Sequence, residues 1–137
     1  PRLGRFLWGD WLQQEAPPQV EASSVTAAYR CPYGRHQREV QVDDGGHRWT
    51  ITDICSGFQH QALLRWRLCP GEWLLDGSSL IGPMVRLQIQ CDQPITRLEL
   101  VLGWESRYYG AKVKLPVLEV IVAQAPAIFT TSIQLSA

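Results

Sequence analysis

The chain has 137 residues, of which 45% are hydrophobic and 19% charged, and its 13 basic residues balance its 13 acidic ones. This composition is typical of a globular protein, and the length suits one domain with a sizeable core. A net charge of zero argues against a strongly basic nucleic-acid-binding surface. No apolar run approaches the roughly 20 residues that would cross a membrane.

The N-terminal fourteen or so residues carry many apolar side chains, but their pattern is too short to assign. Phe6 to Trp8 fits a strand, and Asp10 fits the cap of one helical turn that ends before Pro17. The stretch does not have the pattern of a signal peptide. Because the chain opens directly in domain-like sequence, we expect it to be a piece of a longer protein.

Residues 19–30 predict a strand with small inward-facing groups such as Val20, Ala22 and Val25, followed by a turn at residues 31–34. Residues 39–73 then predict a meander of three successive antiparallel strands. Asp44-Gly45 favours a two-residue hairpin turn between the first two of these strands.

The third strand of the meander has the clearest alternation. Its apolar face holds Leu64, Trp66 and Leu68, and its polar face holds Arg65 and Arg67. Such alternation is typical of an antiparallel sheet with one face in water.

Further strands are predicted over residues 73–75, 84–91, 95–102, 112–122 and 128–135. Pro116 interrupts one of them, which predicts an edge strand or a bulge. In total the sequence predicts about eight to ten short strands and little or no helix. The expected fold class is therefore an all-β antiparallel β-sandwich that occupies residues 1–137 as one domain.

Motifs for catalysis are lacking in this sequence. There is no G-x-S-x-G, no glycine-rich phosphate loop and no H-E-x-x-H. His47 is predicted to lie in a turn and His60 at the start of a strand. We predict no catalytic residue and no metal site.

The four cysteines are Cys31, Cys55, Cys69 and Cys91, and none lies in a C-x-x-C pair. We favour free or partly buried thiols over a disulfide framework.

Three residues with ionisable side chains are candidate site residues. His36 and Arg38 share a strand face and could together bind a carboxylate or a sulfate, although a solvated strand face is the favoured interpretation. Asp53 alternates with Ile51 and Cys55, which predicts that it points inward. A buried carboxylate needs partners, so we favour a structural acid, paired with an arginine or with turn amides, over a catalytic or metal-binding one.

Six tryptophans are many for this length, and stacking on sugar rings is one use of exposed aromatic side chains. Trp49 and Trp66 fall on patterned faces and are predicted in the core. Trp104, with Tyr108 and Tyr109, is the best candidate for a carbohydrate-binding platform. A loop that folds back over the core is an equally open alternative.

The order of five short segments resembles the C-terminal part of heparinase II/III-like polysaccharide lyases. These segments are RFLW, RHQREV, WTITDICSG, LRWRLCPGEW and SRYYG. The resemblance implies a helical toroid upstream of a β-sandwich, and β-elimination at a uronic acid by a Tyr and a His, with an Asn or Glu that neutralises the carboxylate. It also implies a structural zinc held by His and Asp residues near an H-N-T segment.

None of those catalytic or zinc residues has a counterpart in this chain, so the resemblance implies a non-catalytic end of the sandwich without a cofactor of its own. His36 and Arg38 match the family's H-x-R pattern, Asp53 its aspartate before a Ser/Gly turn, and Tyr109-Gly110 its Y-G turn. Packing roles are expected for them. The implied partners are an acidic polysaccharide and the upstream toroid, with no nucleic acid or membrane, and the implied location is periplasmic or secreted.

Three functions follow as hypotheses. The leading one is an accessory β-sandwich region of a polysaccharide lyase, inactive alone. The second is a stand-alone carbohydrate-binding module. The third is a structural interaction domain in which the segment with Trp8 and Trp11 docks on the rest of the protein.

Overall fold

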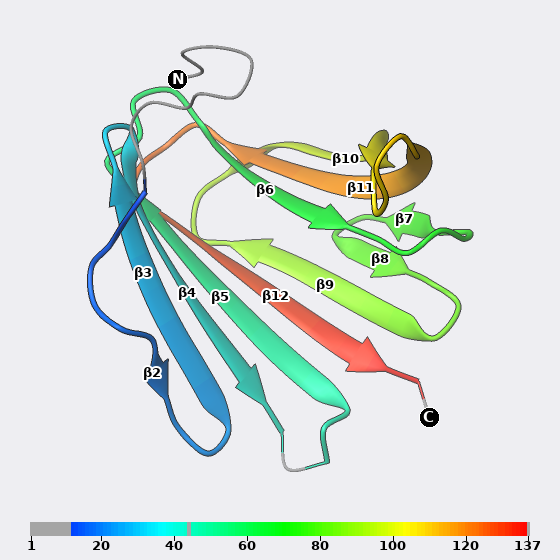
Figure 1. The fold of residues 1–137 in the computed structure, drawn as a ribbon, viewed down its shortest axis with the longest axis horizontal. Helices are drawn as coiled ribbons and strands as arrows, with labels where there is room; N and C mark the ends of the chain where they lie inside the picture. The colour runs from blue at the N-terminus through cyan, green and yellow to red at the C-terminus, as the bar shows by residue number, and fades with distance from the viewer. Residues whose placement is uncertain (1–11, 44, 137) are drawn as a thin grey trace.

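The computed structural model describes residues 12–43 and 45–136, and within them the chain forms two antiparallel sheets and no helix (Figure 1). The larger sheet has nine strands in the order β1-β3-β4-β5-β12-β9-β8-β7, with β2 paired to β3. The smaller sheet has three strands in the order β10-β11-β6. The predicted all-β antiparallel sandwich is therefore confirmed.

The strands of the larger sheet are β1 (Gln13–Gln14), β2 (Gln19–Val20), β3 (Ser24–Cys31), β4 (Gly34–Val42), β5 (Arg48–Ser56), β7 (Leu74–Asp76), β8 (Ser79–Ile81), β9 (Val85–Cys91) and β12 (Ala127–Leu135). Those of the smaller sheet are β6 (Ala62–Arg67), β10 (Ile95–Glu105) and β11 (Val113–Val122). These described strands number twelve, above the predicted eight to ten, because β1 and β2 are pairs of residues too short to be read from a pattern.

The core lies between the sheets. From the smaller sheet, Leu118 and Val120 of the central strand β11 are fully buried, and from the larger sheet Leu80, Ile89 and Phe129 meet them. Along β9 the alternation of apolar and polar residues dictates which side faces inward. Burial of these apolar faces is the main stabilising contribution that this fold has.

The predicted three-strand meander is wrong at its third member. β4 and β5 pair as expected, but β6 crosses to the smaller sheet and pairs with β11. The second edge of β5 is taken by β12 over eight residue pairs. Gly57, with φ of +76°, turns the chain away from the larger sheet directly after β5.

The turn between β4 and β5 is longer than the predicted Asp44-Gly45 hairpin. The last pair of the ladder is Val42 with Trp49, and the Oδ1 of Asp43 accepts hydrogen bonds from the backbone N–H groups of His47 and Arg48. A glycine with positive φ is found at Gly46. The aspartate side chain, which imitates a turn carbonyl, therefore stabilises a wider loop.

Two further expectations are corrected at the N-terminal side of the sheet. Residues 19–30 form a hairpin of β2 and β3 rather than one strand, and Val20 and Val25 are exposed. Trp49, expected in the core, is 39% exposed, and its indole N–H donates to the carbonyl of Gly46. The exposure of Val20, Val25 and Trp49 arises because the three-stranded sheet does not extend over this part of the nine-stranded one.

Pro116 lies in the central strand of its sheet and not at an edge. It sits one residue beyond Val117, the last partner of β6, and its carbonyl accepts a hydrogen bond from the N–H of Leu68. Because the nitrogen and the carbonyl of one strand residue point to the same side, the donor that proline lacks would have faced Leu68. The ladder between β11 and β6 therefore ends at this position.

Candidate functional site

A buried carboxylate is the centre of the main polar cluster. Asp53, in the middle of β5, is 0% exposed. Its Oδ1 lies 2.6 Å from Nε2 of His36, and Arg38 binds both carboxylate oxygens, with Nε–Oδ1 at 2.7 Å and Nη2–Oδ2 at 3.0 Å. The structure therefore brings Asp53 together with His36 and Arg38, which the sequence had offered as a separate pair of candidates.

The ladder between β4 and β5 explains this geometry. Arg38 stands directly opposite Asp53, and His36 stands opposite Cys55, one step along the same face. Since residues two apart on a strand share a face, one carboxylate reaches both side chains. The interpretation of His36 and Arg38 as simply solvated is wrong, because both are engaged by Asp53.

Aromatic residues support the cluster from two sides. The ring of Tyr29 meets the His36 ring edge-on at 5.0 Å between centroids, and the guanidinium carbon of Arg38 lies 5.1 Å from the ring centroid of Trp66. The indole N–H of Trp66 donates to the hydroxyl of the fully buried Thr131. The cluster is thereby tied to β3, to β12 and to the smaller sheet.

Electrostatics explains why Asp53 stays ionised in this place. Burial opposes the charged form, but the hydrogen bonds from His36 and Arg38 outweigh burial, so that the pKa of Asp53 lies below its ordinary value. The neighbouring thiol responds in the opposite way. Burial, together with the negative charge of Asp53, raises the pKa of Cys55 to about 11.

A pocket of about 580 Å³ opens beside this cluster, between β3, β4 and β5 on one side and β6 on the other. Its lining is mainly apolar and includes Tyr29, Phe58 and Leu64 in addition to the three polar residues. Nδ1 of His36 is buried and has no hydrogen-bond partner among the residues that the structure describes. The pocket can thus accept an apolar group at its wall, but its charges are already compensated by one another.

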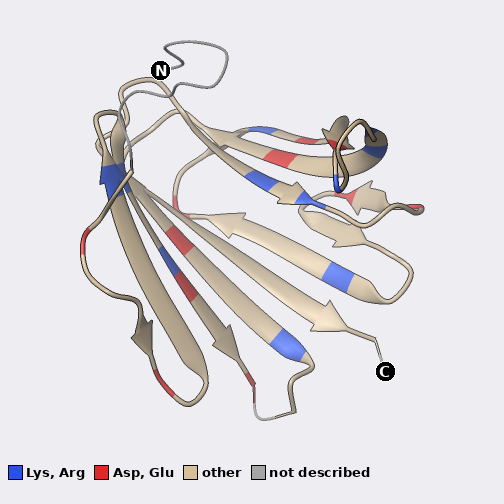
Figure 2. Cartoon of the chain, in the orientation of Figure 1, with Lys and Arg blue, Asp and Glu red and all other residues tan. Residues whose placement is uncertain are grey.

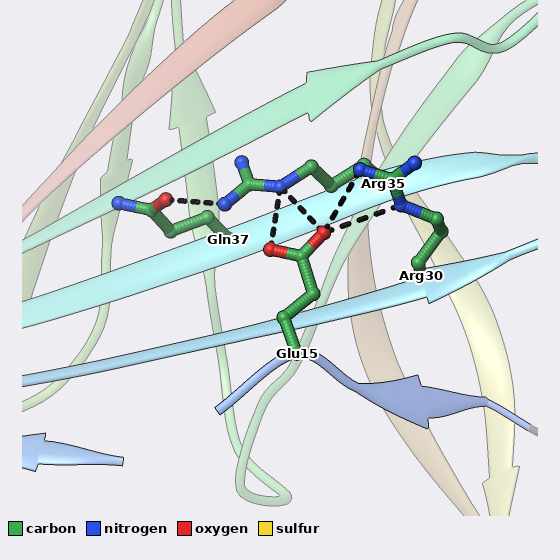
Figure 3. A network of polar contacts seen from close by, with 4 residues as sticks. All are labelled: Glu15, Arg30, Arg35 and Gln37. Carbon is green, nitrogen blue, oxygen red and sulfur yellow. Dashed lines mark hydrogen bonds and ion pairs between the residues drawn. The ribbon is translucent and has the colours of Figure 1, made fainter. Parts of the chain in front are cut away.

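A second network lies on the opposite face of β4. Glu15 accepts hydrogen bonds from Arg30 and Arg35, the closest at 2.9 Å, and Arg35 also donates to the side-chain carbonyl of Gln37 (Figure 3). The hydrogen bond from Arg35 lowers the pKa of Glu15 below its ordinary value, although burial acts to raise this pKa. This network fastens the segment after β1 to β3 and β4, and nothing in the sequence pattern had indicated it.

The aromatic candidates lie at the other end of the molecule. Trp104 belongs to β10 rather than to the predicted loop and is 45% exposed, while Tyr108 and Tyr109 are exposed in the turn before β11. The ammonium groups of Lys112 and Lys114 lie 4.2 Å and 5.4 Å from the centroid of the Trp104 ring. Two cations thus already contact the indole that a sugar would use.

Basic and acidic residues are interspersed over the strands of the two sheets (Figure 2). All four cysteines are free thiols, and Cys69 is the exposed one. In residues 12–43 and 45–136 no group of three His, Cys, Asp or Glu side chains is placed to hold a metal ion. The same part of the chain contains no helix that could span a membrane.

Several pocket residues were missed by the sequence analysis. Tyr29, Phe58 and Leu63 line the pocket, yet only the pairing of β3 with β4 and the crossing of β6 bring them to it. Cys55 could have been found, because it follows Asp53 on the same face. Trp8 and Trp11 lie outside the described residues.

Comparison with known proteins gives matches to solved structures alone. No protein-family model matches the chain, and no curated protein sequence matches it. A heparinase III gene product matches with a TM-score of 0.68 and 20% identity, over 90% of this chain and 21% of its own. The heparan sulfate lyase HepC from Pedobacter heparinus matches with a TM-score of 0.68 and 16% identity, over 91% of this chain and 22% of its own.

A further heparinase III structure matches with a TM-score of 0.68 and 13% identity, over 91% of this chain and 21% of its own. The chain thus spans about a fifth of the length of these enzymes, as one domain-sized part of a larger protein would. At these identities the similarity establishes the fold. The resemblance to heparinase II/III-like lyases that the sequence indicated is confirmed at that level.

Proposed function

We propose that this chain is the accessory β-sandwich region of a polysaccharide lyase that cleaves uronic-acid-containing glycans by β-elimination, and that it does not catalyse the reaction alone. The observation that carries this proposal is the match of some 90% of the chain to about 21% of heparinase III. An upstream helical toroid, implied by the family resemblance, is the proposed partner within the same protein. A periplasmic or secreted location is proposed on the same ground.

The chemistry of the described residues supports a non-catalytic role. β-Elimination needs a base that can reach the substrate and a group that neutralises the uronate carboxylate. Nε2 of His36 is bound to Asp53, and Nδ1 of His36 is buried. Arg38 is engaged by both oxygens of Asp53. These side chains are therefore committed to one another rather than presented to a glycan.

No zinc site is proposed in this chain. The zinc implied by the family resemblance requires clustered His and Asp ligands, and the described residues do not supply three such side chains in one place. In this proposal the zinc ligands, like the catalytic residues, belong to another part of the longer protein.

The test is a lyase assay on the isolated chain. Heparan sulfate and other uronate polymers are incubated with it, and the ultraviolet absorbance of the unsaturated product is followed, with an active heparan sulfate lyase as the positive control. We expect no rise above the buffer blank. Steady turnover that His36→Ala abolishes would overturn the proposal.

A second candidate function is binding of an acidic polysaccharide at the β10–β11 end. The specific observation is the exposed set of Trp104, Tyr108 and Tyr109 beside Lys112 and Lys114. Exposed aromatics and cations are the groups that stack on sugars and pair with their sulfates or carboxylates. A groove of about 460 Å³ borders Trp104 and Lys112.

Isothermal titration with heparan sulfate oligosaccharides tests this second function. If it holds, the triple variant Trp104→Ala, Tyr108→Ala, Tyr109→Ala weakens binding at least about tenfold, as loss of stacking worth 1.4 kcal/mol or more requires. Tyr33→Ala, which removes an exposed tyrosine of the β3–β4 turn, is the matched control. Equal affinities of the wild type and the triple variant would exclude the site.

A further inference from the structure

Both lysines of this chain lie against one indole. The sequence has two lysines among its 13 basic residues, at positions 112 and 114. The ammonium group of Lys112 lies 4.2 Å from the ring centroid of Trp104, and that of Lys114 lies 5.4 Å from it. Attraction between a cation and the face of an aromatic ring accounts for these contacts. The free chain therefore holds two cations at a ring that is 45% exposed.

The ladder of the β10–β11 hairpin explains how both lysines reach the ring. Lys114 stands directly opposite Trp104, and Lys112 precedes Lys114 by two residues. Residues two apart in extended chain share a side, and direct and diagonal neighbours across two strands are within reach of long side chains. Both ammonium groups thus approach the indole from the same neighbouring strand, on flexible stems that can also turn toward a ligand.

The surroundings of the ring have an excess of positive charge. Glu105 lines the same groove as Trp104 and Lys112, but Nε of Arg107 binds its Oε2 at 2.8 Å. With that pair compensated, the two lysines give residues 104–114 two further positive charges. An exposed ammonium group gains only a modest attraction from a ring face, whereas a sulfate or a carboxylate offers it a charge-assisted hydrogen bond.

We propose that Lys112 and Lys114 select acidic over neutral glycans by exchanging their partner. In the free chain they lie against the indole of Trp104. When an acidic glycan binds, they turn to its sulfate or carboxylate groups, and the ring face that they leave stacks on a sugar. This inference rests on the glycan-binding function proposed above for the β10–β11 end.

The exchange penalises a neutral glycan. Such a ligand must displace the ammonium groups from the ring without replacing the attraction that they lose, whereas an acidic ligand supplies the replacement itself. A cation–π contact at an exposed site corresponds to about two- to fivefold in an equilibrium constant. Loss of both ammonium groups should therefore have opposite effects on the two classes of ligand, which a general attraction of cations for a polyanion does not predict.

Isothermal titration of the full chain tests this with two ligands that share one backbone. They are a heparan sulfate oligosaccharide and the same oligosaccharide after desulfation, N-acetylation and reduction of its carboxylates. Lys112→Gln with Lys114→Gln should weaken binding of the acidic ligand at least about fivefold and strengthen binding of the neutral one at least about twofold.

The matched control removes two positive charges elsewhere. Arg48→Gln with Arg86→Gln changes two exposed arginines of β5 and β9, and it should leave both affinities within about twofold at physiological salt, where distant charges are screened. If the wild type does not bind the acidic ligand, the glycan-binding function fails and the inference fails with it. If the wild type binds it but the lysine variant gains no affinity for the neutral ligand, the partner exchange alone is overturned.

The wild type also offers a measurement of the exchange itself. With lysine labelled by carbon-13, nuclear magnetic resonance observes the ε-methylene groups of Lys112 and Lys114 alone. The ring current of Trp104 should shift their proton signals upfield in the free chain, and Trp104→Ala should abolish this shift. Saturation with the acidic ligand should return both signals toward those of an exposed lysine. Signals that stay upfield in the saturated complex would overturn the proposal.

Discussion

Oδ1 of Asp53 lies 2.6 Å from Nε2 of His36, although the two residues are not opposite each other in the ladder. The carboxylate also holds Arg38, its direct partner across the strands. One buried acid on β5 thus fixes two successive inward positions of β4. A slip of the ladder by one residue would turn both partners to the other face, so the cluster specifies the register of the two strands.

Replacement of Asp53 by Asn should destabilise the fold by about 2 kcal/mol. Loss of one partner of a buried pair usually costs roughly 3–5 kcal/mol, but Arg38 is 39% exposed at its side chain and regains hydration. Urea denaturation measures the change in the free energy of unfolding. Asp76→Asn, at an exposed strand end, is the matched control and should stay within about 0.5 kcal/mol of the wild type.

The stabilisation by Asp53 should disappear in acid. Its pKa is lower in the folded chain than in the unfolded one, so its contribution is complete above the unfolded pKa of about 3.9 and is lost as the pH falls through the folded pKa. The difference in unfolding free energy between the wild type and Asp53→Asn should therefore be constant from about pH 6 to pH 5 and shrink below about pH 4. A difference that grows toward acid would contradict the assigned charge state.

The sequence was most informative where alternation and burial agree. Leu64 and Leu68 face the core as the period-two pattern predicts, and Asp53 lies on the inward side of its strand. These features depend only on the strand conformation of each segment, in which successive side chains point to opposite faces. The all-β sandwich class could be predicted for the same reason.

The partners of each strand were harder to predict because pairing is a property of the whole chain. β6 follows β5 directly in the sequence, yet the place beside β5 is taken by β12, which begins about 60 residues after the end of β6. The contact of Tyr29 with His36 likewise depends on the ladder between β3 and β4. The exposure of Trp49 follows from the short extent of the smaller sheet, which no local pattern records.

Gly34 should be more sensitive to substitution than other glycines with positive φ. It starts β4 with φ of +145°, and a Cβ at this position would come within 2.5 Å of the carbonyl oxygen of Ser56. Gly34→Ala must therefore bear backbone strain and also separate β4 from the end of β5. We expect a loss of about 3 kcal/mol, against about 1 kcal/mol for strain alone.

Gly46→Ala is the matched control for this steric contribution. Gly46 also has a positive φ, of +70°, but a Cβ there meets no atom within 4 Å. Thermal unfolding of the two variants separates strain from the contact with Ser56. Equal melting temperatures for both would show that the close approach of β4 and β5 carries no cost.

The four free thiols should react with an alkylating reagent in a defined order. Burial, reinforced by the charge of Asp53, raises the pKa of Cys55 to about 11, so at pH 8 only about one molecule in a thousand has the reactive thiolate at this position. Burial also raises the pKa of Cys91. Mass spectrometry after treatment with iodoacetamide should therefore find Cys69, the exposed thiol, modified first and Cys55 last.

In Asp53→Asn both the charge and part of the local packing are lost, so the modification of Cys55 should accelerate while that of Cys69 stays unchanged. Rapid alkylation of Cys55 in the folded wild-type chain would show that the pocket beside Asp53 is open to the reagent and that the thiol is not shielded.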